Sequence, residues 1–155
     1  EKFYKAKNFF ILGRNFTYPI ALEAALKIKE ISYIHSEGSL SSEMKHGPIA
    51  LLDNNFPILY LLSNDKSTVL KEIMNLYEAH TRSKKIILFA TTGSIELIDP
   101  EFLSQIEFIS IPDKIPSVLP LYFTLLAQLL SYHLAKLNNL SIDQPRNLAK
   151  VVTVA

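Results

Sequence analysis

The stretch FPILYLL, from Phe56 to Leu62, decides the fold of this 155-residue chain. It is an almost uninterrupted apolar run, which is typical of a strand that is buried on both faces. Asn8–Leu12 (NFFIL) and Lys85–Ala90 (KIILFA) have the same character. Strands covered on both sides occur mainly in parallel sheets, so we expect a parallel sheet between two layers of helices.

Helical patterns lie between these strands. Thr17 is placed to cap a helix that starts with Tyr18-Pro19 and runs to about Ser32, because proline is tolerated in the first turn of a helix. Ser67 to about Thr81 and Val118–Leu137 are also predicted helices, and Ser39–His46 fits one or two turns that stop at Gly47-Pro48. In the Ser67–Thr81 helix the apolar positions in step are Val69, Leu70, Ile73, Leu76 and Tyr77.

Two further strands complete the predicted sheet. Tyr33–Glu37 is short and more polar, and Ile106–Ile111 (IEFISI) alternates, which places it nearer an edge. Strands that alternate with helices predict an α/β fold, a flavodoxin-like doubly wound five-stranded parallel sheet with helices on both faces. Ligands in such folds bind at the carboxyl ends of the strands, near the point where the strand order reverses.

Composition excludes several classes of function. The formal net charge is +1, so there is no general electrostatic reason to bind nucleic acid or an anionic membrane. There is no cysteine, and the four histidines lack metal-ligand spacing, so we expect no metal and no cofactor. The apolar run Val118–Leu130 is broken by Pro120, Thr124 and Gln128 and cannot span a bilayer. The chain begins at Glu1 rather than methionine, and we expect a cytoplasmic piece of something longer.

Three charged residues form a candidate cluster on the first helix. Glu23, Lys27 and Glu30 follow one another at i, i+4 and i+7, within about 60° around the helix, whereas Lys29 points away. They fit a solvated face with an ion pair. The alternative is a proton-moving carboxylate that a lysine tunes beside a cleft.

Two side chains elsewhere, His46 and Lys150, have two interpretations each. His46 in SSEMKHGP complements a helix C-terminus as a cation or acts as a general acid and base. His80 ends a surface helix, and His133 fits a hydrogen-bonded core position. Lys150 is a solvated lysine unless the apolar tail docks, in which case a desolvated amine can form a Schiff base.

The loop Ser63–Thr68 (SNDKST) follows the strongest strand, where a doubly wound fold can hold phosphate. It has no glycine to allow close backbone approach, and Asp65 adds a negative charge. We therefore expect a helix cap there, with Ser63, Asp65 or Ser67 as the capping residue, and no phosphate.

Three segments together resemble a known family. GRNFTYPIALEAALKIKEISYIH, SEMKHGPIALLD and DQPRNLAKVVTV are similar to the C-terminal end of the glucosamine-6-phosphate synthases, the isomerising glutamine–fructose-6-phosphate amidotransferases. The resemblance runs from about Phe9 to Ala155. It implies a sugar-isomerase (SIS) domain over residues 1–140 and a C-terminal tail, 141–155, that completes the isomerase site. The glutaminase domain and the first SIS domain, whose Ser/Thr-rich loop holds the sugar phosphate, would be missing partners.

The resemblance also implies roles for individual residues. Lys150 matches the tail lysine that forms a Schiff base with open-chain fructose 6-phosphate. Glu30 matches the carboxylate that moves a proton between the first two sugar carbons, and Lys27 matches a lysine that assists it. His46 matches a histidine of ring opening that reaches the neighbouring subunit of a homodimer. Glu23 and Arg14 are supporting residues, and Ala149 offers its carbonyl to a sugar hydroxyl.

The function expected is the isomerase part of an enzyme that makes glucosamine 6-phosphate from fructose 6-phosphate and glutamine, inactive as this piece alone. One alternative is a sugar-phosphate-sensing regulatory module. Another is a related isomerase or deglycase that acts on phosphorylated amino sugars.

Overall fold

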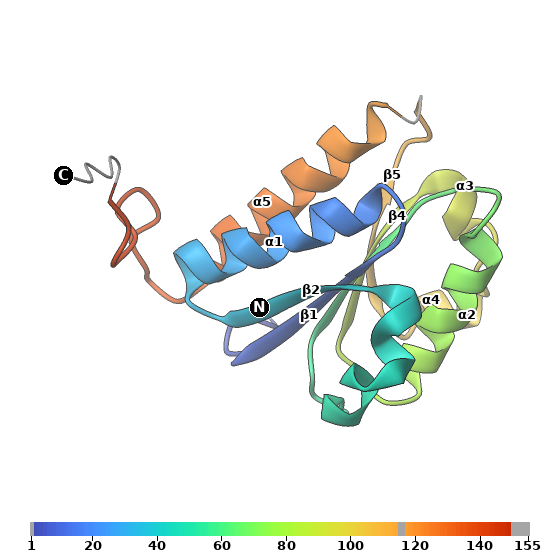
Figure 1. The fold of residues 1–155 in the computed structure, drawn as a ribbon, viewed down its shortest axis with the longest axis horizontal. Helices are drawn as coiled ribbons and strands as arrows, with labels where there is room; N and C mark the ends of the chain where they lie inside the picture. Colours follow the sequence, from blue (N-terminus) through green and yellow to red (C-terminus); the bar gives the residue numbers. More distant parts are fainter. Residues whose placement is uncertain (1, 115–116, 150–155) are drawn as a thin grey trace.

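The computed structural model describes residues 2–114 and 117–149, and a five-stranded parallel sheet lies at its centre (Figure 1). The strand order is β2-β1-β3-β4-β5, the flavodoxin-like order that the sequence predicted. All four neighbouring pairs are parallel, and β5 is an edge strand as expected. The strands are β1 (Asn8–Gly13), β2 (His35–Leu40), β3 (Ile58–Leu62), β4 (Ile86–Thr91) and β5 (Glu107–Ile111).

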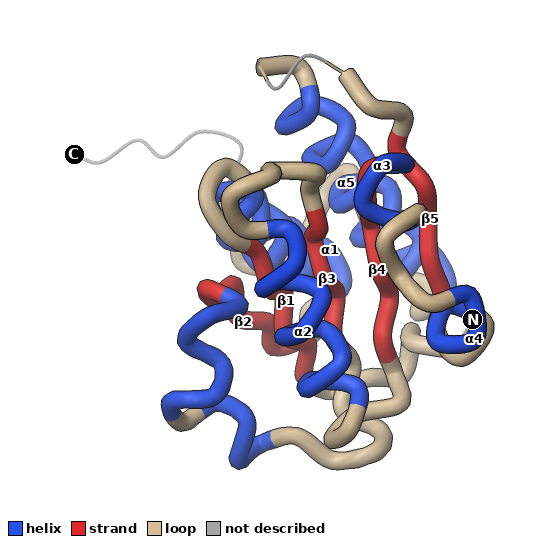
Figure 2. The backbone as a smooth tube through the Cα atoms, turned by 90° about the vertical axis from the view of Figure 1, so that its right-hand side faces the viewer, coloured by secondary structure: helices blue, strands red, loops and turns tan. Residues whose placement is uncertain are grey.

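Helices cover both faces of this sheet (Figure 2). α1 (Thr17–Ser32) and α5 (Leu119–Leu137) pack side by side on one face. The opposite face carries α2 (Val69–His80) and the 3₁₀ helix η1 (Ser41–His46), which Gly47 ends and η2 (Pro48–Leu51) follows. The sequence did not predict α3 (Thr92–Ile95) and α4 (Pro100–Leu103), because a four-residue helix is about one turn and too short to show a period.

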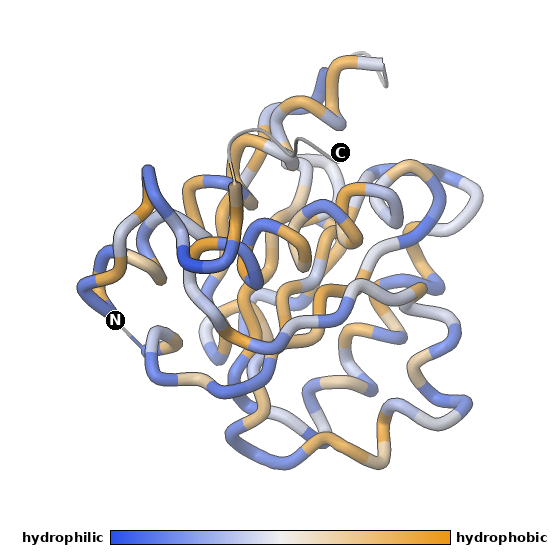
Figure 3. Tube along the Cα trace, turned by 60° about the vertical axis from the view of Figure 1, so that its left-hand side comes forward, coloured by the Kyte–Doolittle hydropathy of each residue, from blue (hydrophilic) through white to orange (hydrophobic). Residues whose placement is uncertain are grey.

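The central strands bury both of their faces, which explains their continuous apolar runs. Successive side chains alternate across the sheet, so one strand supplies two cores. Phe9, Ile11 and Leu59 face α1 and α5, whereas Phe10, Ile58 and Tyr60 face α2. The hydropathy colouring in Figure 3 shows apolar segments gathered inside and hydrophilic segments in the outer loops.

Two glycines let α1 lie directly on the sheet. A Cβ atom at Gly13 would stand 2.5 Å from the carbonyl oxygen of Thr17. A Cβ at Gly38 would stand 2.6 Å from the carbonyl oxygen of Ala21. Both distances lie far inside van der Waals contact, so these positions require glycine for the helix to keep its place.

The predicted cap at Thr17 is wrong. Thr17 is the first residue of α1, and the N-cap position is Phe16. The Thr17 hydroxyl accepts the Arg14 backbone N–H at 2.8 Å and donates into the loop before the helix. The Thr17 side chain therefore stabilises the tight loop between β1 and α1 by bonding to the backbone of Arg14, and it does not cap the helix.

Solvent exposure also differs from the sequence patterns at several positions. Leu70 is 66% exposed although it was placed on the apolar side of its helix, and Glu72 is only 3% exposed. His80 is buried against Phe102, and His133 is exposed. Elements distant in sequence cover the side of α2 that carries Glu72 and His80, whereas Leu70 lies on its solvent side. His133 lies on the outer side of α5, which is uncovered within the part of the chain that the structure describes.

Candidate active site

The charged cluster on α1 is an ion-paired trio. The Lys27 Nζ lies 2.7 Å from Glu30 Oε2 and 3.6 Å from Glu23 Oε1. All three side chains are partly exposed, at 30%, 27% and 40% respectively. The hydrogen bond to Glu30 raises the pKa of Lys27 more than burial lowers it, with a further contribution from Glu23. Lys27 is therefore held as a cation between the two carboxylates.

A hollow of about 470 Å³ lies at the C-terminal end of α1. It is bounded by that helix, the start of β2 and the tail that follows α5. Its lining residues are Leu26, Lys29, Glu30, Tyr33, Ile34, His35, Arg146, Asn147 and Leu148. The structure thus brings Glu30 and the tail segment 146–148 to one place. Lys29 is exposed as expected, yet it belongs to this hollow as well.

The position of this hollow differs from the general expectation for doubly wound folds. α1 starts at the carboxyl end of β1 and returns antiparallel to it, so Glu30 lies over the amino ends of the strands. β2 begins at His35, directly beside Tyr33. A site that includes Glu30 is therefore at the end of the sheet opposite to the carboxyl ends.

The tail is attached to the body of the domain through Tyr33. The backbone N–H of Arg146 donates a hydrogen bond to the Tyr33 hydroxyl at 2.8 Å. The Arg146 guanidinium carbon lies 4.1 Å from the centroid of the Tyr33 ring. Ala149 lines a second hollow formed within the tail, together with Asp143, Gln144, Pro145 and Leu148. Lys150, the predicted Schiff-base residue, lies outside the described residues.

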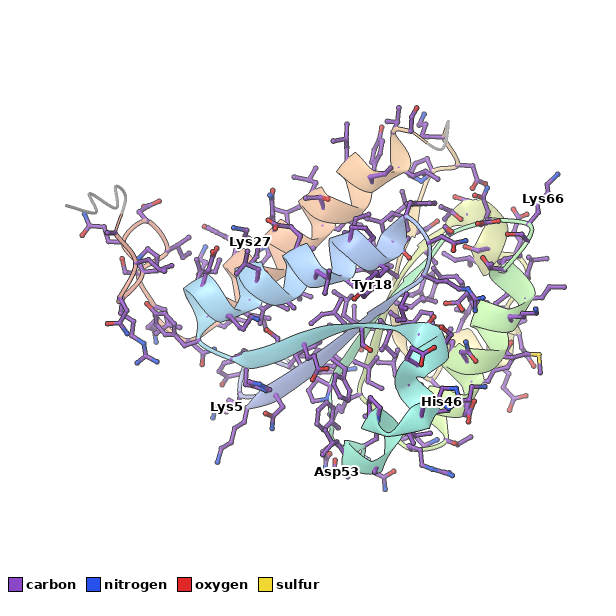
Figure 4. The ribbon with its side chains drawn as sticks, in the orientation of Figure 1. Lys5, Tyr18, Lys27, His46, Asp53 and Lys66 are labelled. Atoms are coloured by element: carbon purple, nitrogen blue, oxygen red, sulfur yellow. The ribbon has the colours of Figure 1, made fainter. Side chains whose placement is uncertain are left out.

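His46 lies on the other face of the sheet. It is exposed at the end of η1, whose Met44 belongs to the core shared with α2. Figure 4 shows Lys27 on α1 and His46 on η1, on opposite sides of the sheet. The structure of one chain therefore does not bring His46 together with Glu30.

Arg14 is also remote from the charged trio. It follows β1, and its Nη1 lies 3.4 Å from Oε1 of Glu72 on α2. A supporting contact from Arg14 to Glu30 is therefore absent among the described residues, and Arg14 belongs to a different polar group.

That polar group is centred on Glu72 and was missed by the sequence analysis. Besides Arg14, the carboxylate accepts hydrogen bonds from Ser41 Oγ, from Tyr60 Oη at 3.0 Å and from Asn75 Nδ2 at 3.3 Å. Burial, and then the charge of Glu72, raise the pKa of Tyr60 well above its usual value. The group ties α2 to η1, β3 and the loop after β1, and it therefore fixes the segment that ends in His46.

One signal could have revealed this group. Glu72 shares a helical face with Val69 and Leu76, at i, i+3 and i+7, so an acidic residue stands in line with buried ones. Its partners, however, come from three other elements that a periodic pattern does not identify.

The loop Ser63–Thr68 closes on itself. Asp65 accepts from the backbone N–H and hydroxyl of Ser67 and from Asn15 Nδ2. The Ser67 hydroxyl first, and then the Ser67 N–H and Asn15, lower the pKa of Asp65. The predicted helix cap is wrong: the N-cap of α2 is Thr68, which makes no side-chain cap, and Asp65 instead stabilises the loop before the helix. The exclusion of phosphate there stays a prediction.

Neither a metal-holding cluster nor a membrane-spanning helix is found in residues 2–114 and 117–149. Across residues 2–114 and 117–149, no three acidic or histidine side chains converge in a way that would hold a metal ion. No helix within the described part of the chain has the length and hydropathy needed to cross a membrane.

Comparison with known proteins identifies the family of this chain. The model of the SIS domain family matches residues 2–137, and the chain belongs to this family. It is 46% identical over 149 residues to a glutamine–fructose-6-phosphate aminotransferase (isomerizing) of Chlorobaculum tepidum, covering 96% of this chain and 24% of that protein. A protein of the same name from Sphingobium yanoikuyae is 41% identical, with 96% of this chain and 93% of that one covered.

Solved structures agree with this assignment. The C-terminal domain of glucosamine-fructose-6-phosphate aminotransferase from Francisella tularensis superposes with a TM-score of 0.85 at 40% identity, covering 92% of this chain and 39% of that one. Tagatose-6-phosphate ketose/aldose isomerase from Escherichia coli has a TM-score of 0.71 at 18% identity, which shows a shared fold, and covers 86% of this chain and 36% of that one. The chain spans about a quarter of the first aminotransferases that it matches.

Proposed function

We propose that this chain is the isomerase SIS domain of an enzyme that converts fructose 6-phosphate and glutamine into glucosamine 6-phosphate. The observation that carries the proposal is the hollow that Glu30 shares with tail residues 146–148, together with 41–46% identity to aminotransferases of that name. A cytoplasmic location, a homodimer and the division into a domain (1–140) and a tail (141–155) belong to the same proposal.

The chemistry assigns one task to each residue. The Lys150 amine attacks the second carbon of the open-chain ketose and forms an imine with loss of water. Ammonia released from glutamine in the parent enzyme then displaces the lysine amine, which frees Lys150 and leaves an imine at the second carbon. Glu30 takes a proton from the first carbon of this imine and delivers it to the second, because one carboxylate can reach both carbons of a planar enolamine. Lys27, whose Nζ lies 2.7 Å from Glu30 Oε2, orients this carboxylate for the transfer.

His46 and Arg14 have roles that fit their distance from Glu30. His46 is exposed on the face opposite to Glu30, and we assign it to the site of a neighbouring subunit. Arg14 supports His46 indirectly, because Arg14 pairs with Glu72 and Glu72 bonds to Ser41 of η1, the helix that ends in His46. Glu23 holds Lys27 from the side away from Glu30, and Ala149 offers its carbonyl to a sugar hydroxyl.

Two substitutions in the intact enzyme test the proposal. Lys150→Arg abolishes isomerisation and leaves glutamine hydrolysis largely unchanged, because a guanidinium keeps the charge and forms no imine. Glu30→Gln reduces incorporation of solvent deuterium into the sugar by about 10²–10⁴-fold. Glu107→Gln is the matched control, because Glu107 is also an exposed carboxylate paired with a lysine, Lys2, but lies on the edge strand. Product formation at a normal rate by Lys150→Arg would contradict the role of Lys150.

The chain alone is expected to form no product, because the phosphate-binding loop and the ammonia source belong to other domains. Expression of the chain with and without a preceding SIS domain tests this point. Isomerisation of fructose 6-phosphate by the chain alone would contradict it.

A further inference from the structure

Tyr33 occupies a backbone position that does not favour tyrosine. It is the residue after the last turn of α1, with φ 57° and ψ 20°, in the left-handed region. Helices often end in this conformation, and glycine is the usual residue there because a Cβ is disfavoured. A tyrosine at this position keeps a strained backbone, which points to a use for its side chain.

The side chain of Tyr33 makes two contacts with the same residue of the tail. Its hydroxyl accepts the Arg146 backbone N–H at 2.8 Å, and its ring lies 4.1 Å from the Arg146 guanidinium carbon. One contact fixes the main chain and the other fixes the side chain. Residues 33 and 146 are 113 positions apart, so the pair joins the end of α1 to the tail.

We propose that Tyr33 is a positioning residue that anchors the tail through Arg146 and thereby sets where Lys150 works relative to Glu30. This inference rests on the proposed function. Glu30 and Tyr33 line the same hollow, and both belong to the end of one helix. Lys150 follows Arg146 by four residues, so a fully extended chain allows its Cα at most about 14 Å from that anchor. Arg146 itself lines the hollow that contains Glu30, so this chain length sets an upper limit on how far from Glu30 the amine can work.

A glycine substitution at position 33 distinguishes the anchoring role of the Tyr33 side chain from the role of this residue in ending α1. Tyr33→Gly removes both contacts but suits the left-handed backbone, so the domain keeps or gains stability. Tyr33→Phe removes only the hydroxyl. Asn139→Gly is the matched control, because Asn139 also follows a helix with a positive φ, 56°, and does not line the hollow.

The first measurement is cleavage of the chain by trypsin after Arg146, followed by mass spectrometry. Tyr33→Gly should raise the cleavage rate about five- to thirtyfold, which corresponds to the loss of one hydrogen bond and one exposed cation–π contact. Tyr33→Phe should give an intermediate rate and Asn139→Gly no change. Urea unfolding checks that each variant is folded. A cleavage rate that Tyr33→Gly leaves unchanged would overturn the anchor.

The second measurement is borohydride trapping of fructose 6-phosphate on Lys150 in the intact enzyme. Tyr33→Gly should slow trapping and Tyr33→Phe should restore part of the rate. If Tyr33→Gly releases the tail without slowing trapping, Tyr33 does not position Lys150. Absence of trapped sugar on the unaltered enzyme would contradict the proposed function, whereas the anchor is decided by the cleavage rates alone.

Discussion

The two helical layers of this domain hold their carboxylates in opposite ways. On the α1 face, the Glu30 side chain is 27% exposed and is paired with Lys27 beside a hollow. On the α2 face, the Glu72 side chain is 4% exposed and accepts hydrogen bonds from four side chains. A group that exchanges protons with a ligand needs access to it, whereas a group that joins several segments is best kept from water. One layer is therefore suited to chemistry and the other to holding the framework.

The largest expected effect is on stability. Glu72→Leu leaves Arg14 and the hydroxyls of Tyr60 and Ser41 without their shared acceptor, and we expect a loss of about 3–5 kcal/mol in the free energy of unfolding. Glu30→Gln, at a partly exposed pair, should cost less than about 1 kcal/mol. Urea unfolding of both variants measures the difference. Equal losses would remove the distinction between the two layers.

An intermediate effect is expected on the pH dependence of stability, in which buried His80 and exposed His46 should differ. Burial first, and then the charge of Lys84, lower the pKa of His80 below its ordinary value. The unfolded chain therefore takes up a proton more readily, so stability is complete above pH about 6.5 and declines as the pH falls toward the folded pKa.

Substitution of His80 tests this sign. His80→Phe should flatten the change in unfolding free energy between about pH 7 and pH 5, because phenylalanine also packs against Phe102 and does not titrate. His46→Gln, at an exposed position on the same face, should leave the pH dependence in place. A dependence that follows His46 instead would show that burial of His80 is not its cause.

The smallest expected effect belongs to the trio on α1. The pKa of Lys27 is raised, chiefly by the hydrogen bond to Glu30, so its contribution to stability is complete below pH about 10.5 and is lost as the pH rises through the folded value. Lys27→Met should cost a few tenths of a kcal/mol at pH 8, about the value of a surface pair, and less above pH 11. A loss that stays constant across this range would show that packing of the lysine stem, and not its charge, is responsible.

The same contrast explains what the sequence could predict. Continuous apolar runs identify β3 and β4 because burial on both faces leaves a local pattern, and the period of α1 places Glu23, Lys27 and Glu30 together. The burial of Glu72 depends on Ser41, Tyr60 and Arg14, which come from three other elements. The pairing of Tyr33 with Arg146 joins the two ends of the fold, and no local pattern encodes such a contact.

The glycines beneath α1 have a consequence for the chemistry at its far end. At Gly13 and Gly38 the backbone of α1 lies directly against the sheet, through Thr17 and Ala21 respectively. Glu30 lies nine residues beyond Ala21, about 13 Å further along a rigid rod. A Cβ atom at either glycine would push the helix off the sheet and displace the Glu30 carboxylate from the hollow that it shares with the tail. The position of the Glu30 carboxylate thus depends on the absence of side chains at Gly13 and Gly38.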